Sequence, residues 1–81
     1  MANQEQLDIL KQGVDVWNQW RRVNRGVEID LSSAKLTGAE LNLANLRGAN
    51  LNNAYLNLAN LIGAHLEGAN LTHTTSQSNI L

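Results

Sequence analysis

Several residue types are scarce or missing in this 81-residue chain, which has no cysteine, no proline, no phenylalanine and one tyrosine. Without cysteine there is no disulfide, no thiolate nucleophile and no thiolate metal site. Six Lys and Arg face seven Asp and Glu, a net charge of −1, so the basic surface of a nucleic-acid-binding protein is missing. There is also no apolar run of membrane-spanning length and no signal-peptide pattern at the start. We therefore expect a cytoplasmic protein with no nucleic-acid and no membrane partner.

The chain is rich in one feature, a five-residue repeat. Residues 29–73 divide without a gap into nine units, with leucine third in all nine and alanine first in eight, Ile29 being the exception. A period of five fits neither the helical period of 3.6 nor the strand period of two. Each unit therefore presents two inward side chains, two residues apart, and then a corner. Glycine often fills the corner, as at Gly38 and Gly48.

This run of Ala–(Asp/Asn)–Leu–x–x units resembles the pentapeptide-repeat family. The resemblance implies an all-β solenoid, a right-handed quadrilateral β-helix with one pentapeptide per side and four per coil. Nine units would then make about two coils, with each residue n stacked on residue n+20 at roughly the strand spacing of 4.8 Å. Leucine and alanine would fill the interior, and stacking would create the core. The layout of a helix followed by repeats resembles that of small cyanobacterial members.

We interpret residues 1–28 as a helical cap with an entry segment. Residues 3–23 are predicted to be helical, with Asn3 as the N-cap and Gly26 just beyond the end. The apolar candidates for the cap lie at helical spacing or beside it; they are Leu7, Leu10, Val14, Trp17 and Trp20. Gly13 leaves open whether this is one helix or two. A solenoid end needs such a cover, although exposed tryptophans would also suit a protein-docking surface.

Apolar exceptions on the outside of the repeats indicate an interaction surface. Leu43, Leu58 and Ile62 occupy outward or corner places, where other units carry mainly small, polar or charged residues. In the n/n+20 register they lie on or beside the third side of the coil, with Tyr55 one side away. We predict that these four residues contact a partner protein or a second copy. Local packing of the corners is the alternative.

The same register predicts specific contacts between coils. On the first side, Asn50 lies under Asn70, and stacked asparagines can form amide ladders. On the fourth side, Arg47 lies under Glu67, which predicts an exposed ion pair. Both contacts test the register rather than the function.

The repeat fails after residue 73, and residues 74–81 form a polar tail that ends in Ile80 and Leu81. These two residues could fold over the end of the column, but they make a small lid. An open apolar end with unpaired edges invites association. We therefore expect that the chain either binds another protein or forms a homodimer through its C-terminal end.

No arrangement of residues points to catalysis, a cofactor or a metal. The carboxylates of the repeats, Asp30, Glu40 and Glu67, fall on three different sides, which defeats a paired acid–base mechanism. His65 and His73 also lie apart and cannot share a metal. Leucine and alanine fill the interior, so no cavity for a small-molecule substrate is expected. The predictions are no enzyme, no cofactor and no metal.

Two functions from different classes follow. The first is a non-catalytic structural or protein–protein interaction module. The second comes from the resemblance, because some pentapeptide-repeat proteins act on DNA gyrase by imitating duplex DNA with an acidic rod. The net charge of −1, the short repeat run and the lack of phenylalanine favour the first function. A flat threonine array for ice binding is disfavoured, since Thr37 and Thr72 fall on different sides.

Overall fold

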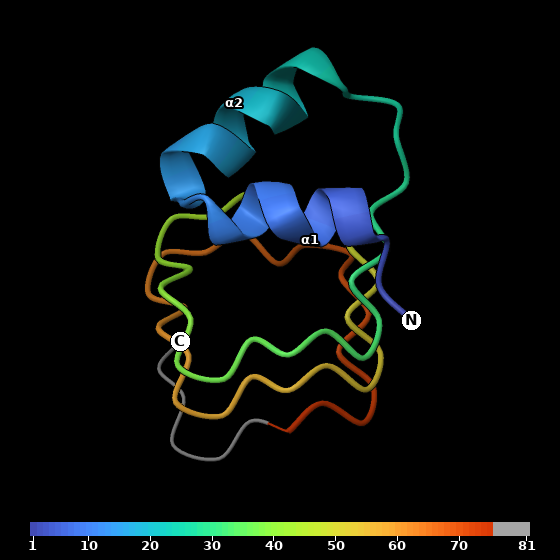
Figure 1. The fold of residues 1–81 in the computed structure, drawn as a ribbon, viewed down its shortest axis with the longest axis vertical. Coiled ribbons are helices and arrows are strands. Elements are labelled where there is room, and N and C mark those ends of the chain that lie inside the picture. Colours follow the sequence, from blue (N-terminus) through green and yellow to red (C-terminus); the bar gives the residue numbers. More distant parts are fainter. Residues whose placement is uncertain (76–81) are drawn as a thin grey trace.

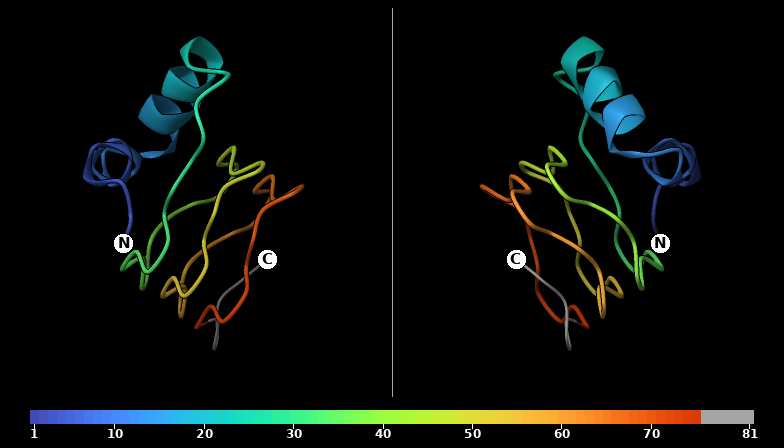
Figure 2. Two further views of the ribbon diagram at one scale, coloured as in Figure 1. Left: turned by 90° about the vertical axis from the view of Figure 1, so that its right-hand side faces the viewer. Right: turned by 90° about the vertical axis from the view of Figure 1, so that its left-hand side faces the viewer.

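The computed structural model describes residues 1–75, which form a pair of helices and a stack of coils (Figure 1). Helix α1 spans Gln4–Lys11 and helix α2 spans Val14–Val23. The first coil is residues 29–48 and the second is residues 49–68, each with four sides numbered in chain order. The helices lie against the end of the stack formed by the first coil (Figure 2). The column therefore has one covered end.

The predicted helix over residues 3–23 is two helices, separated at Gly13. Asn3 caps α1 as predicted, because its Oδ1 accepts a hydrogen bond from the Gln6 N–H at 3.1 Å. Gly13 then turns the chain with a φ of 120°, a conformation that residues with a Cβ rarely adopt, and becomes the N-cap of α2. The break lets the two helices meet different sides of the first coil.

The coils are joined by isolated parallel bridges between residues twenty apart. The pairs are Asp30–Asn50, Lys35–Tyr55, Glu40–Asn60, Asn45–His65, Asn50–Asn70 and Tyr55–Thr75. Each bridge falls on the second place of a unit, so a side has one bridge and the described residues contain no continuous strand. The predicted n/n+20 register is found, and pairing extends to Thr75. The β-structure is thus minimal and shares the chain with two α-helices.

Every corner is a tight turn with a positive φ. The third-place leucine C=O accepts from the N–H three residues later, as in Leu31 and Ala34 at 3.1 Å. Positive φ at the residue just before the last of a four-residue turn is characteristic of a type II turn. All nine fifth-place residues adopt it: Gly38, Gly48, Gly63 and Gly68 at 69–75°, and Ser33, Leu43, Asn53, Leu58 and His73 at 58–66°. The repeat therefore imposes this conformation whichever residue occupies the corner.

The second-place asparagines fold back on their own unit. Asn50 Oδ1 accepts from the Asn52 N–H at 3.0 Å, and Asn70 Oδ1 accepts from the Thr72 N–H at 2.9 Å. The same bond recurs at Asp30, Asn45 and Asn60. The expected amide ladder is therefore not formed by these oxygens, because each is taken by the backbone two residues on, as in an Asx turn. This local bond explains the preference for Asn or Asp at the second place.

The core is a column of leucine and alanine whose burial decreases away from the helices. Ile29 and the third-place leucines from Leu31 to Leu61 are at most 4% exposed. Leu66 is only partly buried, and Leu71 is 38% exposed. The predicted lid residues Ile80 and Leu81 lie outside the described residues. The two ends of the column therefore differ in cover.

Candidate functional site

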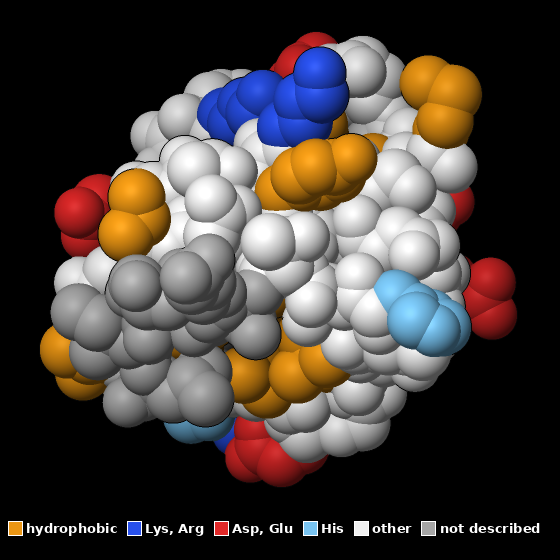
Figure 3. Space-filling model, turned by 90° about the horizontal axis from the view of Figure 1, so that it is seen from below, with side chains coloured by type: hydrophobic (Ala, Val, Ile, Leu, Met, Phe, Trp, Pro, Cys, Tyr) orange, Lys and Arg blue, Asp and Glu red, His pale blue; other side chains and the backbone are white. Residues whose placement is uncertain are grey.

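The residues of the predicted interaction surface are all exposed. The exposed fractions are 60% for Leu43, 63% for Leu58, 52% for Ile62 and 47% for Tyr55. Leu43 and Ile62 are brought together, since the Leu43 N–H donates to the Ile62 C=O at 3.0 Å. Leu58 lies at the other corner of the third side, and Tyr55 lies on the second side. On the face seen in Figure 3, hydrophobic side chains also form separate groups among polar ones.

Leu43 and Leu58 hold a backbone conformation that leucine rarely adopts. Both have a φ of 66°, a region where a side chain with a Cβ costs roughly 1–2 kcal/mol. Core packing does not repay this cost, because more than half of each side chain is exposed. Leu43 also depends on Gly63, where an added Cβ would lie 2.7 Å from the Leu43 Cδ2. Ser33, Asn53 and His73 have a similar φ at exposed corners, so Leu43 and Leu58 differ from them in leaving an apolar side chain exposed.

The predicted cap residues lie between the helices and the column. Leu7, Leu10 and Trp17 are buried, and Val14 and Trp20 are partly buried against the core. Trp17 is fully buried and stacks on Trp20 with ring centroids 5.3 Å apart. The largest apolar side chains of the chain therefore cover the column, and Trp17 has no surface left for docking.

On the first side, the helical segment pairs with the free backbone edge of the first coil. The Asp30 N–H donates to Gln6 Oε1 and the Asp30 C=O accepts from the Asn3 N–H, both at 2.8 Å. Within the stack, Asn50 is paired in the same way, with its N–H donating to the Ile29 C=O at 2.9 Å. Gln6 and Asn3 therefore take the place that a further coil would occupy. Gln6 is accordingly only 4% exposed.

The fourth side is paired in the same manner by α2. The Asn45 N–H donates to Asn18 Oδ1 at 2.7 Å, and Trp17 Nε1 donates to the Asn45 C=O at 2.8 Å. Asn18 Nδ2 also donates to the Leu43 C=O at 3.0 Å. The bonds to Asn45 satisfy partly buried backbone groups that would be costly to leave unpaired. The cap is thus a hydrogen-bonded substitute for a coil as well as an apolar lid.

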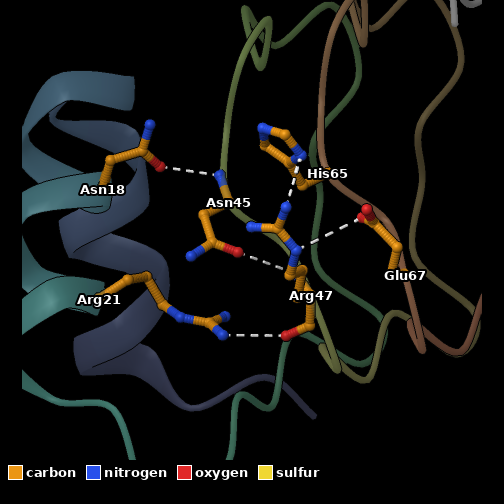
Figure 4. Close-up of polar contacts among 6 residues, drawn as sticks. All are labelled: Asn18, Arg21, Asn45, Arg47, His65 and Glu67. Atoms are coloured by element: carbon orange, nitrogen blue, oxygen red, sulfur yellow. Dashed lines mark hydrogen bonds and ion pairs between the residues drawn. The ribbon is translucent and has the colours of Figure 1, made fainter.

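Beyond Asn45, α2 and the fourth side share a polar seam (Figure 4). Arg21 Nη2 donates to the Arg47 C=O at 2.9 Å. The predicted ion pair is confirmed, with Arg47 Nε 3.6 Å from Glu67 Oε1, and Arg47 Nη2 also lies 3.0 Å from His65 Nδ1. Both partners of the pair are exposed, so it is worth about 0–1 kcal/mol.

Arg21 is the residue of this seam whose charged group is incompletely paired. Its guanidinium lies 6.0 Å from the centre of the Trp17 ring, and its Nη1 is buried without a partner among the described residues. Burial, and then the charge of Arg47, lower the pKa of Arg21 below its ordinary value. The seam therefore holds α2 in place at some electrostatic cost.

Sequence reasoning missed the pairing of Gln6 and Asn18 with the backbone of the first coil, and the contact of Arg21 with the fourth side. A signal was available for the two amides, because Gln6 precedes Leu7 and lies one turn before Leu10, and Asn18 follows Trp17. An amide beside an apolar stripe can pair with a backbone edge that the stripe covers. Arg21 gave no such signal, since arginine near a helix C-terminus is already explained by the helix dipole.

The chemistry available to the described residues is limited. Within residues 1–75, no three His, Asp or Glu side chains converge in the way that a metal ion requires. Neither α1 nor α2 is long and apolar enough to cross a bilayer. What the geometry offers is backbone edges and exposed apolar corners, both of which are features of protein recognition.

Comparison with known proteins agrees with the repeat pattern. The family model described as pentapeptide repeats matches eight copies, in residues 27–61 and 39–75. No curated protein and no solved structure gives a significant match. The matched residues make up more than half of the chain and include both complete coils. With its units in register at every corner, the chain belongs to the pentapeptide-repeat family.

Proposed function

We propose that the repeats form the right-handed quadrilateral β-helix of this family, and that the protein is a non-catalytic module that binds another protein. The parallel bridges at n/n+20 and the filled leucine column support the fold. The family is one of repeat and interaction modules, which supports the non-catalytic role. The docking surface in this proposal is the corner surface, defined as Leu43, Leu58, Ile62 and Tyr55.

The observation that carries the proposal is that Leu43 and Leu58 leave large apolar side chains exposed at corners whose φ suits glycine. Both corners stack on glycine in the neighbouring coil, Leu43 on Gly63 and Leu58 on Gly38, and both glycines have positive φ. Glycine therefore suits these positions, and leucine brings a backbone cost without burial. Binding a partner would bury the two exposed side chains and give them a role that the isolated fold does not.

A double substitution at the corners separates binding from stability. Leu43→Asn with Leu58→Asn should keep or raise stability, because asparagine tolerates positive φ. The variant should also lose the partner that the unaltered chain retains on co-purification from its native cell extract. The matched control is Ser33→Asn with His73→Asn, two exposed corners with positive φ outside the corner surface. Retention of the same partner by the leucine variant would contradict the proposal.

Self-association through the C-terminal end is the second form of this proposal. Its support is the exposure of Leu71 and the partial burial of Leu66, in contrast to the buried leucines under the helices. Two such ends related by a two-fold axis would cover each other. Sedimentation velocity over a range of concentrations should show a dimer that Leu71→Thr weakens and the double corner variant does not. A monomer at every concentration would exclude this form.

The alternative, a DNA-mimic regulator of DNA gyrase, has less support because the net charge is only −1. Inhibition of gyrase supercoiling by the unaltered chain would favour it over the interaction module.

A cytoplasmic location is part of the proposal and is supported by a sequence without cysteine.

A further inference from the structure

The helical cap leaves a gap over the third side of the first coil. A hollow of about 250 Å³ lies there, with Leu10, Leu36, Ala39 and Leu41 in its lining. A second hollow of about 450 Å³ adjoins it and is lined by Val14, Val16 and Asn42 among others. Gly13 and Glu40 line both hollows, so the two lie next to each other. We call the two adjoining hollows together the elbow groove, because they lie at the turn between α1 and α2.

The backbone edge beside this groove is unpaired. The edges of the first and fourth sides are paired at Asp30 and Asn45 by residues of the helical segment. In contrast, none of the hydrogen bonds found within residues 1–75 uses the N–H or C=O of Glu40. Ala39, beside Glu40, is only partly buried, whereas Ala34 and Ala44 are at most 2% exposed. The third side therefore offers a free backbone edge beside a partly exposed alanine.

We propose that the elbow groove binds an extended segment of a partner protein, which adds to the edge at Glu40 by backbone pairing. Within the stack, a second-place residue is paired by the C=O and the N–H that flank its neighbour, as Asn60 is by Ala39 and Leu41. A segment in extended conformation can offer the same two groups to Glu40, which is the chemistry of β-strand addition. Its small first side chain would then cover Ala39, which is only partly buried.

Charge determines the middle residue of the segment. The exposed carboxylates of Asp15 and Glu40 both line the groove, with Lys11 at its other end. In parallel stacking, the middle side chain of an added segment lies beside that of Glu40, as Asn60 does on the opposite edge, where its Nδ2 donates to Glu40 Oε2. A Lys or Arg at this place pairs with the carboxylate, and an acidic residue is repelled. The segment therefore has a small residue over Ala39, followed by a basic residue beside Glu40.

The probe for this site is a blocked peptide of two Ala-Lys-Leu-Thr-Gly units, titrated into the full ¹⁵N-labelled chain. Amide shifts should saturate and be largest at Gly13, Ala39 and Glu40, and the Glu40 amide should exchange more slowly with solvent. A peptide with Glu in place of Lys should bind about three- to tenfold more weakly. Glu40→Lys should reverse this preference.

Glu67→Lys provides the matched control, because it makes the same charge change on the fourth side, away from the groove. The affinity of the Glu67→Lys variant for the Lys peptide and for the Glu peptide should stay close to that of the unaltered chain. Shifts centred on the corner surface or on Leu71, or a charge preference that Glu40→Lys leaves unchanged, would overturn the proposal. The double corner variant should bind the peptide normally, so failure of the corner surface and failure of the elbow groove are distinguishable.

Discussion

The two ends of the leucine column are made from the same repeat but differ in cover. Under the helices, Leu31, Leu36, Leu41 and Leu46 are at most 2% exposed, whereas at the other end Leu71 is 38% exposed. The repeat units are alike at both ends, so the difference comes from α1 and α2. A pentapeptide column can thus pack its own sides, but its ends need an element from outside the repeat.

The largest expected effect is at Trp17, which is central to the covered end. Trp17→Ala removes a fully buried side chain and the donor to the Asn45 C=O. We expect a loss of about 3–5 kcal/mol in the free energy of unfolding, measured by urea denaturation followed by circular dichroism. Leu71→Ala is the matched change at the other end and should cost less than about 2 kcal/mol. Equal losses of stability in the two variants would show that the helices do not cause the difference between the two ends of the column.

The next effect concerns the edge pairing rather than the apolar cover. Gln6→Leu keeps a side chain of similar size but leaves the Asp30 N–H and the Glu28 C=O without their partner. A buried unpaired group costs about 1–3 kcal/mol, so urea denaturation should show a loss of this size. Gln4→Leu, on the exposed face of α1, is the control and should change stability by under about 0.5 kcal/mol. A tolerated Gln6→Leu would mean that the cap acts by apolar cover alone.

Most of the repeat could be predicted because every unit has the same pattern of residues. The third-place leucine defines the inside, the first-place alanine defines the crowded position, and the period of five defines the corner. The n/n+20 register and the Arg47–Glu67 pair follow from that period. The exposed leucines of the corner surface were predictable for the same reason, since they depart from a clear pattern.

The sequence predicted a helical cap and its apolar residues, but not the hydrogen bonds that hold it, because these contacts join separate elements. Apolar spacing indicated which face of the helices is buried, but not that Gly13 would divide them. Gln6 and Asn18 owe their roles to the backbone of Asp30 and Asn45, which are distant in sequence. The elbow groove depends on which edges the helices leave free, and this is known only once the helices are placed.

A smaller effect, of opposite sign, is expected at the corners between the two ends. Leu43→Gly should stabilise the fold by up to roughly 1–2 kcal/mol, because it removes a Cβ from a φ of 66°. In the reciprocal change, Gly48→Leu, the added Cβ meets no atom within 4 Å but lies on a backbone with a φ of 69°, so the change should destabilise by a similar amount. Thermal unfolding of the two variants checks both signs. Loss of stability in Leu43→Gly would show that Leu43 packs usefully in the isolated chain.

The smallest effect is a pH dependence at Asp30, on the covered edge. The Ser32 hydroxyl at 2.7 Å, and then the Ser32 N–H at 3.0 Å, donate to Asp30 Oδ1 and lower the pKa of this carboxyl below its ordinary value. A folded-state pKa below the unfolded one means that the carboxylate stabilises the fold above the unfolded pKa of about 3.9. That contribution is lost as the pH falls through the folded pKa.

Asp30→Asn isolates this contribution, because an asparagine at the second place keeps the acceptor for the N–H two residues on, as at Asn50 and Asn70. The variant should be slightly less stable than the unaltered chain near neutral pH. The difference should shrink as the pH is lowered from about 5 toward 3, since only the unaltered carboxyl becomes protonated. Urea denaturation at a series of pH values measures it. Equal stability of the two proteins at every pH would mean that the turn at Asp30 needs an oxygen acceptor but not a charge, as in the second-place turns formed by asparagine.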